Sequence, residues 1–475
     1  MRIERLDGEP AVATVRGALE GTGGAWIVGG TLRDALLGRE LRDVDLAIEG
    51  DPRAAARAVA AAAGGPVFPL SETFGAWRAL SGDGSWHCDI SPLQGPTIEA
   101  DLAQRDFSIN AMASPLAGGE LIDLHGGMTD LSAGLLRVLG PQSYAADPLR
   151  ALRLVRLASE LGLAVDRETE TITRAAAPRI EEASGERIFA ELRGVIVSRR
   201  AVAGLRLAGR LGVAAAVLPE FAALGGVEQS DFHDLDAHEH TLAVLERQIE
   251  LEDDPGRLFG EAGAPLAAVL GEPFADQLTR GEALRFGALF HDLGKPETQG
   301  VREDGRITFI GHDDAGERIV SEICTRLRTS ERLRSFLGAL TRHHLRLGFL
   351  VHEVPLSRVA IYRYLRDCSP VEVEVTALSC ADRLATRGRN AERAIAAHLE
   401  LATQMMFEAL AWRASGGAPS APLRGDELAA ALGIERGPEL GKLVARMREA
   451  VFTGEVSTAS EAIELARALR HNSAP

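Results

Sequence analysis

Two aspartates two positions apart, Asp43 and Asp45, are the first residues of the chain whose spacing suggests chemistry. They lie in RDVDL, a short distance after the apolar stretch that begins at Trp26. Side chains two apart on a strand point to one face of a sheet, so the two carboxylates project together. Mg²⁺ is a hard cation that prefers carboxylate and phosphate oxygens. The pair therefore predicts a divalent metal site.

A second feature, Gly29 and Gly30 followed by a short helix, precedes the aspartates in WIVGGTLRDALLG. Glycine lets a ligand approach the backbone, and a helix start offers N–H groups and a positive dipole end to phosphate. Arg33 adds a charged donor in the first turn. Either motif alone is compatible with an ordinary turn or a solvated strand end. Their combination predicts phosphoryl or nucleotidyl transfer.

Two further candidates follow in the same domain. Asp89, within HCDI, is either a third carboxylate facing Asp43 and Asp45 or an ordinary acid at a strand edge. Arg105 precedes the apolar run RDFSINAMA and is either a triphosphate ligand or part of a polar helix start with Asp106 near the N-cap.

The stretch DPLRALRLVR predicts a helix with Asp147 as N-cap and Pro148 in its first position. Asp147, Arg150, Arg153 and Arg156 recur every three residues along it, which is also the pattern of a solvated charged stripe. An ionised Asp only accepts hydrogen bonds and Arg only donates them. Asp147 and Arg150 could therefore read the amino group and ring nitrogen of cytosine or adenine while rejecting uracil and guanine.

Histidines and aspartates form another pattern in the second half of the chain. Imidazole and carboxylate together suit Zn, Mn, Fe or Ni, and the carboxylates also admit Mg. A bound metal of this kind makes water more acidic for hydrolysis. A single histidine on an apolar helix is more often a packed core residue, but a repeated set favours a metal site. The predicted ligands are His240, His291, Asp292, His312, His343 and Asp382.

Within this set, His343 is favoured over its neighbour His344, and His233 and His238 are expected to be bystanders. Lys295, just after the His291–Asp292 pair, could contact a phosphate.

Composition limits the possible classes of protein. The 475 residues suggest three or four structural units, and a net charge of −16 disfavours nucleic-acid binding over the whole surface. The four cysteines lack C-x-x-C spacing, and neither a signal peptide nor a membrane-spanning run is evident. We expect no membrane partner and a cytoplasmic location; the oligomeric state is left open.

In this order, WIVGGTLRDALLG, RDVDL, RDFSINAMA, IDLHGGMTDL and DPLRALRLVR resemble the class II tRNA nucleotidyltransferase family, which includes CCA-adding, CC-only and A-only enzymes and bacterial poly(A) polymerases. The resemblance implies addition of C and A to the tRNA 3′ end from CTP and ATP. It places Mg²⁺ on Asp43 and Asp45, the triphosphate on Gly30, Arg33 and Arg105, and the nucleotide base on Asp147 and Arg150, with Arg153 and Arg156 as further contacts.

The family also implies an α+β fold: a polymerase-β-like head with a small mixed sheet, then all-α neck, HD and tail domains. The corresponding ranges are 1–140, 141–225, 226–410 and 411–475. The histidine set resembles the HD superfamily of metal phosphohydrolases. Glu186, Arg187 and Glu191 resemble a neck motif for which a structural ion-pair role is expected.

Two positions depart from the family pattern. Gln104 stands where an arginine is frequent, and Ala146 where a glutamate is. Both changes bear on nucleotide choice, so poly(A), CC-only and A-only addition remain alternatives. A phosphohydrolase with a regulatory nucleotide-binding head is the alternative from another class.

Overall fold

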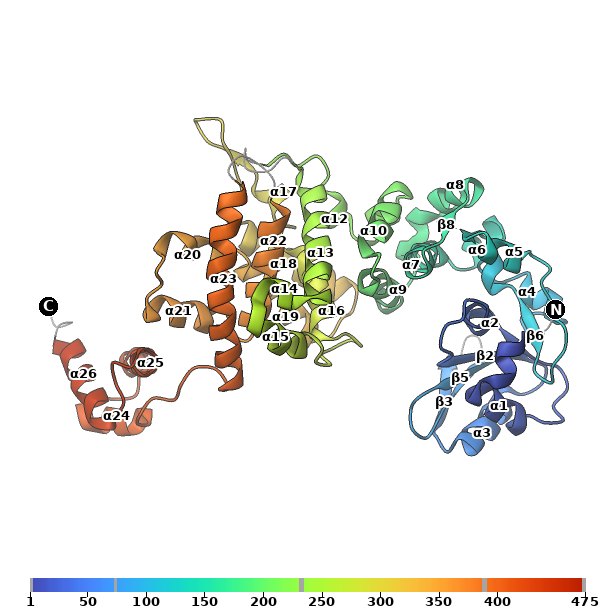
Figure 1. The fold of residues 1–475 in the computed structure, drawn as a ribbon, viewed down its shortest axis with the longest axis horizontal. Helices are drawn as coiled ribbons and strands as arrows, with labels where there is room; N and C mark the ends of the chain where they lie inside the picture. The colour runs from blue at the N-terminus through green and yellow to red at the C-terminus, as the bar shows by residue number, and fades with distance from the viewer. Residues whose placement is uncertain (1–2, 72–74, 230–234, 387–390, 472–475) are drawn as a thin grey trace. The chain divides into compact units, whose positions relative to one another are not determined.

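The computed structural model describes residues 3–71, 75–229, 235–386 and 391–471. It divides into two compact units, Met1–Val217 and Leu218–Pro475 (Figure 1). The division lies near the expected end of the neck at 225, and the boundaries expected at 140 and 410 stay predictions.

The first unit begins with a six-stranded sheet of order β3-β4-β5-β2-β1-β6. Its parallel pair is β2–β5 and the other neighbouring pairs are antiparallel, so the expected small mixed sheet is confirmed. The strands are β1 (Ala25–Val28), β2 (Asp43–Ile48), β3 (Val67–Ser71), β4 (Ala76–Leu80), β5 (His87–Pro92) and β6 (Ala113–Pro115).

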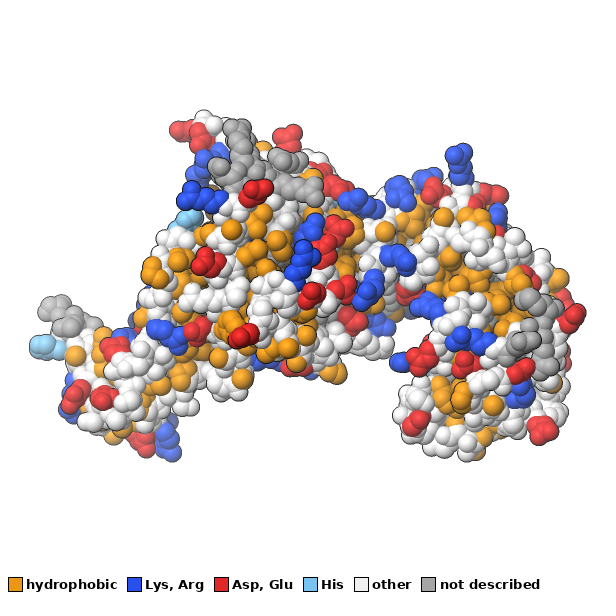
Figure 2. Space-filling view, viewed as in Figure 1, with side chains coloured by type: hydrophobic (Ala, Val, Ile, Leu, Met, Phe, Trp, Pro, Cys, Tyr) orange, Lys and Arg blue, Asp and Glu red, His pale blue; other side chains and the backbone are white. Residues whose placement is uncertain are grey.

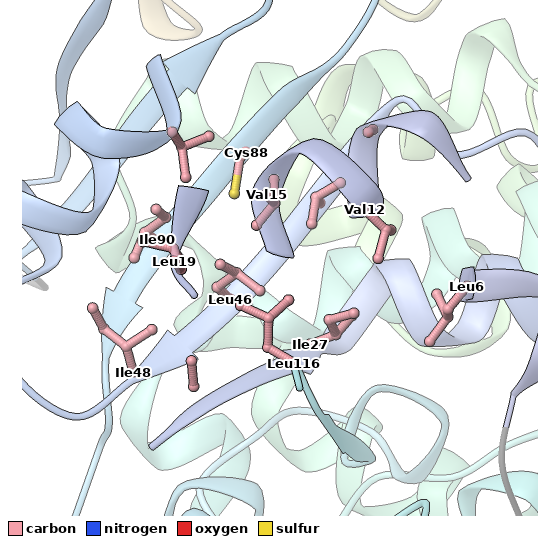
Figure 3. Close-up of a cluster of buried hydrophobic side chains, with 14 of the residues drawn as sticks. Leu6, Val12, Val15, Leu19, Ile27, Leu46, Ile48, Cys88, Ile90 and Leu116 are labelled. Carbon is pink, nitrogen blue, oxygen red and sulfur yellow. The ribbon is translucent and has the colours of Figure 1, made fainter. Parts of the chain in front are cut away.

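The core of this head forms because β2 and β5 alternate between apolar and polar side chains. Val44 and Leu46 are buried on one face with Cys88 and Ile90, and helices α1 (Pro10–Ala18) and α3 (Pro52–Ala63) contribute to the same core. Figure 3 shows side chains of α1 and of the strands meeting in this cluster. The acidic residues of β2 and β5 therefore lie on the opposite face.

The rest of the first unit is mainly helical. Its elements are α2 (Gly29–Leu36), α4 (Ile98–Leu102), α5 (Gly127–Ser132), α6 (Pro141–Ala146), α7 (Arg150–Leu161), α8 (Arg167–Ala176), α9 (Gly185–Val197), α10 (Ala201–Arg210) and α11 (Val213–Val217). The short parallel pair β7 (Leu135–Leu136) and β8 (Ala164–Val165) departs from the all-helical expectation.

Helix α7 starts later than predicted, at Arg150. Asp147 instead ends α6 in an extended conformation, and its carboxylate accepts from the Leu149 N–H at 3.3 Å. The aspartate thus precedes the helix by a short turn and is not its N-cap.

The second unit is a helical body followed by a tail. The helices that carry its predicted ligands or border them are α13 (Ala237–Asp253), α16 (Arg280–Phe290), α17 (Lys295–Thr298), α18 (His312–Arg326), α19 (Glu331–His343), α20 (Arg346–Leu350) and α22 (Glu372–Ala385). The hairpin strands β9 (Gly300–Val301) and β10 (Ile307–Thr308) again depart from an all-helical domain. Tail helices α24 (Gly425–Leu432), α25 (Pro438–Thr453) and α26 (Ala459–His471) share a separate apolar core.

The charged side chains of the surface and the state of the four cysteines agree with what the composition of the sequence suggests. Figure 2 shows basic and acidic side chains interspersed on the visible face of both units. The cysteines at 88, 324, 368 and 380 are buried free thiols. Among the described residues, no helix is both long and apolar enough to cross a membrane.

Candidate functional sites

The head carries its acidic residues on two parallel neighbouring strands. Asp45 on β2 is in register with Asp89 on β5. Burial raises the pKa of Asp45, and the nearby charges of Asp89 and Asp43 raise it further, against the opposing effect of Arg105 and Arg33. A carboxylate whose neighbours are other carboxylates favours a cation beside it. The residues present thus fit a divalent metal at this face.

The two other carboxylates differ from Asp45 in their partners. Asp43 is largely exposed, with His87 Nδ1 3.1 Å from its Oδ1. Asp89 accepts from Arg78 Nε and Nη2, both at 2.7 Å, so a guanidinium covers it in a two-point ion pair. Arg78 was not singled out from the sequence, because only the strand register brings it opposite Asp89. Asp89 therefore has a partner within the protein while lying in register with Asp45 inside the sheet, and its role as a third metal-binding carboxylate stays a prediction.

The glycines lie directly against the charged groups. The Gly30 N–H donates to Asp45 Oδ2 at 3.1 Å. A Cβ on Gly29, whose φ is +62°, would lie 3.1 Å from Arg105 Nη1 and 3.3 Å from Asp45 Oδ2. A side chain here would be strained and would crowd both groups. The cradle therefore brings together backbone, carboxylate and guanidinium, the donors and acceptors that a metal-bound phosphate needs.

Neighbouring side chains hold the two arginines in place. Arg33 donates to Asn110 Oδ1 at 2.9 Å and pairs with Asp34, while Arg105 pairs with Asp101 at 2.8 Å.

A buried threonine that the sequence analysis did not identify, Thr31, connects α2 to β2. Its hydroxyl accepts from the Asp45 N–H at 2.7 Å and donates to the Asp43 carbonyl at 3.1 Å.

A pocket of about 500 Å³ lies beside this cradle, and its walls include Arg105, Gln104, Asp147 and Arg150. Asp147 accepts from Arg187 Nη2 at 2.7 Å. Arg150 donates to the Gln104 carbonyl and to Ser143 Oγ, each at 3.0 Å. The residues predicted to read a nucleobase thus share a pocket with one predicted to bind its phosphates.

Arg153 and Arg156 do not line this pocket, and the contact with the nucleotide expected for them stays a prediction. Both donate to the Glu191 carboxylate on α9, Arg153 Nε at 2.8 Å and Arg156 Nε at 2.6 Å. Arg153 also donates to Asp106 at 3.3 Å. The pattern of threes drifts around a helix, so the later arginines turn toward α9 and away from the pocket. The ion-pair role expected for the neck motif fits Glu191 in this arrangement.

The second unit gathers six ligand-type side chains into two neighbouring groups. Ligand atoms within each group lie within 4.8 Å of one another: His240, His291 and Asp382 form one group, and Asp292, His312 and His344 the other. Asp292 connects them, because its carboxylate lies 3.0 Å from His291 Nε2 and 3.5 Å from His312 Nε2. Burial alone would raise the pKa of Asp292, but His291 and Lys295 outweigh it and hold that pKa well below its ordinary value.

Backbone carbonyls orient three of the imidazoles. The Nδ1 atoms of His291, His312 and His344 lie 2.9, 2.7 and 2.7 Å from the carbonyl oxygens three residues earlier. A proton on Nδ1 leaves Nε2 with a free lone pair directed into the cluster, as metal-binding histidines require. Burial, with His291 nearby, lowers the pKa of His344 to about 3, which keeps this imidazole neutral. The donor set therefore fits a divalent metal.

His344, not His343, belongs to this cluster, so the favoured assignment is corrected. Adjacent residues at the end of a helix point about 100° apart, which sends His343 outward. There its Nδ1 accepts from Arg346 Nε at 3.0 Å. His238 lies outside the cluster, against the Phe221 ring, and His233 lies outside the described residues.

Lys295 is engaged within the protein. Its Nζ donates to Asp292 Oδ2 and to Gln229 Oε1, both at 2.6 Å. These contacts favour a role in holding Asp292 over the phosphate contact considered from the sequence.

Comparison with known proteins identifies three matching family models. The poly(A) polymerase head domain matches residues 25–93 and 85–137, the "Probable RNA and SrmB- binding site of polymerase A" matches 162–224, and the HD domain matches 238–387.

Relatives match along almost the whole chain. An A-adding tRNA nucleotidyltransferase of Deinococcus radiodurans is 33% identical over 92% of this chain and 94% of its own length. A CC-adding tRNA nucleotidyltransferase of Thermus thermophilus is 34% identical over 92% of both chains. The fold is similar to that of a CCA-adding enzyme solved with ATP, with a TM-score of 0.64, 19% identity and 98% of each chain covered.

The two histidines at the end of α19 provide a direct test of the metal site. We expect His344→Ala to weaken Mn²⁺ or Ni²⁺ binding by more than the roughly 10–100-fold cost of losing a group that merely orients a ligand. His343→Ala, the matched control, should leave the affinity unchanged. Isothermal titration calorimetry of the metal-free protein measures both. Equal losses in the two variants, or none in His344→Ala, would contradict the assignment.

Proposed function

Because this chain belongs to the tRNA nucleotidyltransferase family, we propose that it adds C and A to the 3′ end of tRNA from CTP and ATP and releases pyrophosphate. The observation that carries the proposal is the shared pocket. Arg105 reaches both the glycine–Asp45 cradle and the cavity lined by Asp147 and Arg150.

In the proposed reaction, the RNA 3′-hydroxyl oxygen forms a bond to the α-phosphorus. The bond from the α-phosphorus to the oxygen that bridges to the β-phosphate breaks, pyrophosphate leaves, and the hydroxyl proton passes to the solvent. Mg²⁺ held by Asp43 and Asp45 would supply a Lewis acid that neutralises charge on the phosphates. The protein's own contribution is positioning: Arg33 and Arg105 bind triphosphate oxygens, and Gly29 and Gly30 leave room for them.

Base selection rests on the Asp147–Arg150 pair. A bidentate contact of this kind discriminates between bases by roughly 1–3 kcal/mol. Their present partners, Arg187 for Asp147 and the Gln104 carbonyl and Ser143 for Arg150, compete with a base for the same atoms. An incoming nucleotide would exchange with these contacts.

Addition of only part of the CCA sequence is the second candidate. It is favoured by the two relatives that cover more than nine tenths of the chain, which are named for A addition and for CC addition. Gln104 and Ala146, the departures from the family pattern, also lie in the base pocket.

Transcripts of one tRNA ending before C74, before C75 and before A76, each incubated with CTP or ATP alone and sequenced, separate these candidates. Full CCA activity predicts C on the first two transcripts and A on the third. C addition without A, or A addition without C, would establish partial addition. Long A tails on any transcript would contradict both.

Asp45→Asn is expected to lower nucleotide incorporation at least about 10³-fold, because the variant loses the charge beside the cradle. Asp89→Asn, whose carboxylate is already paired with Arg78, should lose far less. Primer extension with radiolabelled CTP measures both rates, and circular dichroism checks that each variant is folded. Normal incorporation by Asp45→Asn would remove this residue from the proposed site.

For the HD domain we propose metal-dependent hydrolysis of a phosphate ester. A water oxygen bonds to phosphorus, the ester P–O bond breaks, and the alcohol leaves with a proton. A metal held by the histidine–aspartate cluster would make that water more acidic. The support is the convergence of six ligand-type side chains around a pocket of about 510 Å³.

Asp292→Ala should abolish phosphoesterase activity and leave nucleotide addition intact, since the variant loses the carboxylate that connects the two ligand groups. Release of inorganic phosphate in the presence of Mn²⁺, Ni²⁺ or Mg²⁺ measures the first activity, and primer extension the second. Absence of phosphate release by the wild-type protein with every metal would refute the hydrolase.

A further inference from the structure

Thr31 is a buried residue in the first turn of α2 whose hydroxyl bonds outside its own helix. The side chain accepts from the Asp45 N–H at 2.7 Å and donates to the Asp43 carbonyl at 3.1 Å. A threonine in a helix commonly donates instead to the carbonyl four residues earlier. Thr376 on α22, which is also buried, does so, and its hydroxyl donates to the Glu372 carbonyl at 2.7 Å. Thr31 therefore connects the glycine turn to the backbone of both predicted magnesium ligands.

The Thr31 hydroxyl takes the place of a strand neighbour. Strand β1 pairs with β2 as far as Ile27, and the chain then turns into α2 at Gly29, whose φ is +62°. Backbone groups of residues two apart on a strand face the same edge, so the Asp43 carbonyl and the Asp45 N–H face the edge that β1 has left. A longer β1 would satisfy both groups but would remove the glycine turn. The hydroxyl satisfies them and keeps the turn open.

The same turn also holds the carboxylate of Asp45. The Gly30 N–H donates to Asp45 Oδ2 at 3.1 Å. Successive residues of α2, Gly30 and Thr31, thus bond to the side chain and to the backbone of one predicted ligand. Metal ligands must be held within about 0.5 Å of their working positions, so these bonds bear directly on metal binding.

The arginines predicted to bind the triphosphate are held by partners other than Thr31. Arg33 donates to Asn110 Oδ1 at 2.9 Å, and Arg105 pairs with Asp101 at 2.8 Å. Loss of the Thr31 hydroxyl should therefore displace the carboxylates more than the guanidinium groups.

Building on the proposed nucleotide addition, we propose that Thr31 is a positioning residue for the head site. Its hydroxyl fixes Asp43 and Asp45 relative to the glycine turn, and this position determines the affinity of the head for Mg²⁺ and the rate of the chemical step. Groups that orient metal ligands typically contribute roughly 10–100-fold to metal affinity or activity.

The test measures primer extension by the full-length protein, with CTP, a tRNA transcript that lacks its 3′-terminal CCA, and varied Mg²⁺. Thr31→Val keeps the shape of the side chain and removes the hydroxyl. We expect it to lower kcat and raise the half-saturating Mg²⁺ concentration, each by roughly 10–100-fold. The KM for CTP should stay within about twofold, because the triphosphate donors keep their own partners. Thr31→Ser, which retains the hydroxyl, should restore both quantities.

Thr376→Val is the matched control, since it removes a buried threonine hydroxyl from the second unit. It should lower the thermal stability and leave kcat and the Mg²⁺ dependence of nucleotide addition unchanged. Equal effects of Thr31→Val and Thr376→Val, an unchanged Mg²⁺ dependence in Thr31→Val, or a Thr31→Ser variant as impaired as Thr31→Val would each overturn the proposal. Circular dichroism checks folding, and Thr31→Ala replaces Thr31→Val if the valine variant is unfolded.

Direct metal binding separates this proposal from failure of the transferase. If the wild-type protein incorporates no nucleotide, calorimetry measures Mg²⁺ binding to protein that carries Asp292→Ala, which weakens the second metal site. Mg²⁺ binding at least about tenfold weaker in Thr31→Val than in Thr376→Val would support the positioning role without the transfer reaction. Equal binding in the two variants would overturn it.

Discussion

Both sites depend on the cost of placing carboxylates where water is scarce. An ionised carboxylate in such a place needs a cation, a hydrogen bond or a proton. Asp45 receives one backbone N–H and the influence of two arginines, yet burial and its acidic neighbours still raise its pKa. Its environment is short of positive charge, which a divalent cation would supply. The surrounding glycines and arginines make sense as the shell of that cation and its phosphate ligand.

Asp292 has the opposite balance. His291 and Lys295 hold its pKa well below the ordinary value, so the carboxylate is ionised before any metal arrives. The imidazoles around it present Nε2 atoms because carbonyl oxygens engage Nδ1. One chain thus contains an oxygen-rich site suited to a hard cation and a nitrogen-rich site suited to a transition metal.

Local sequence patterns predicted most of the secondary structure around the head site. The β1–α2–β2 unit follows from an apolar strand, two glycines and an alternating second strand, and the structure contains it within a few residues. Partners from distant segments could not be predicted in this way. Arg78 meets Asp89 through strand register, and Glu191 lies 35 residues after Arg156 in the chain but accepts its hydrogen bond.

The choice between His343 and His344 failed for a different reason. Two adjacent histidines differ only in helical phase, and the phase at the end of α19 depends on where that helix stops. The start of α7 was missed similarly, because Asp147 and Pro148 form a turn before the helix. Single residues at element boundaries are thus where sequence reasoning about this chain was weakest.

A series of hydrogen bonds links Arg33 to α9. Arg33 donates to Asn110, Asn110 donates to Asp106 at 3.0 Å, and Asp106 and Glu191 both accept from Arg153. The guanidinium of Arg33 is therefore held in one position before a nucleotide binds. Ordering such a side chain at the moment of binding costs about 0.5–1.5 kcal/mol of conformational entropy. In this protein the Arg33 side chain is already ordered on folding. Triphosphate binding therefore loses less conformational entropy, and the affinity for the triphosphate is higher.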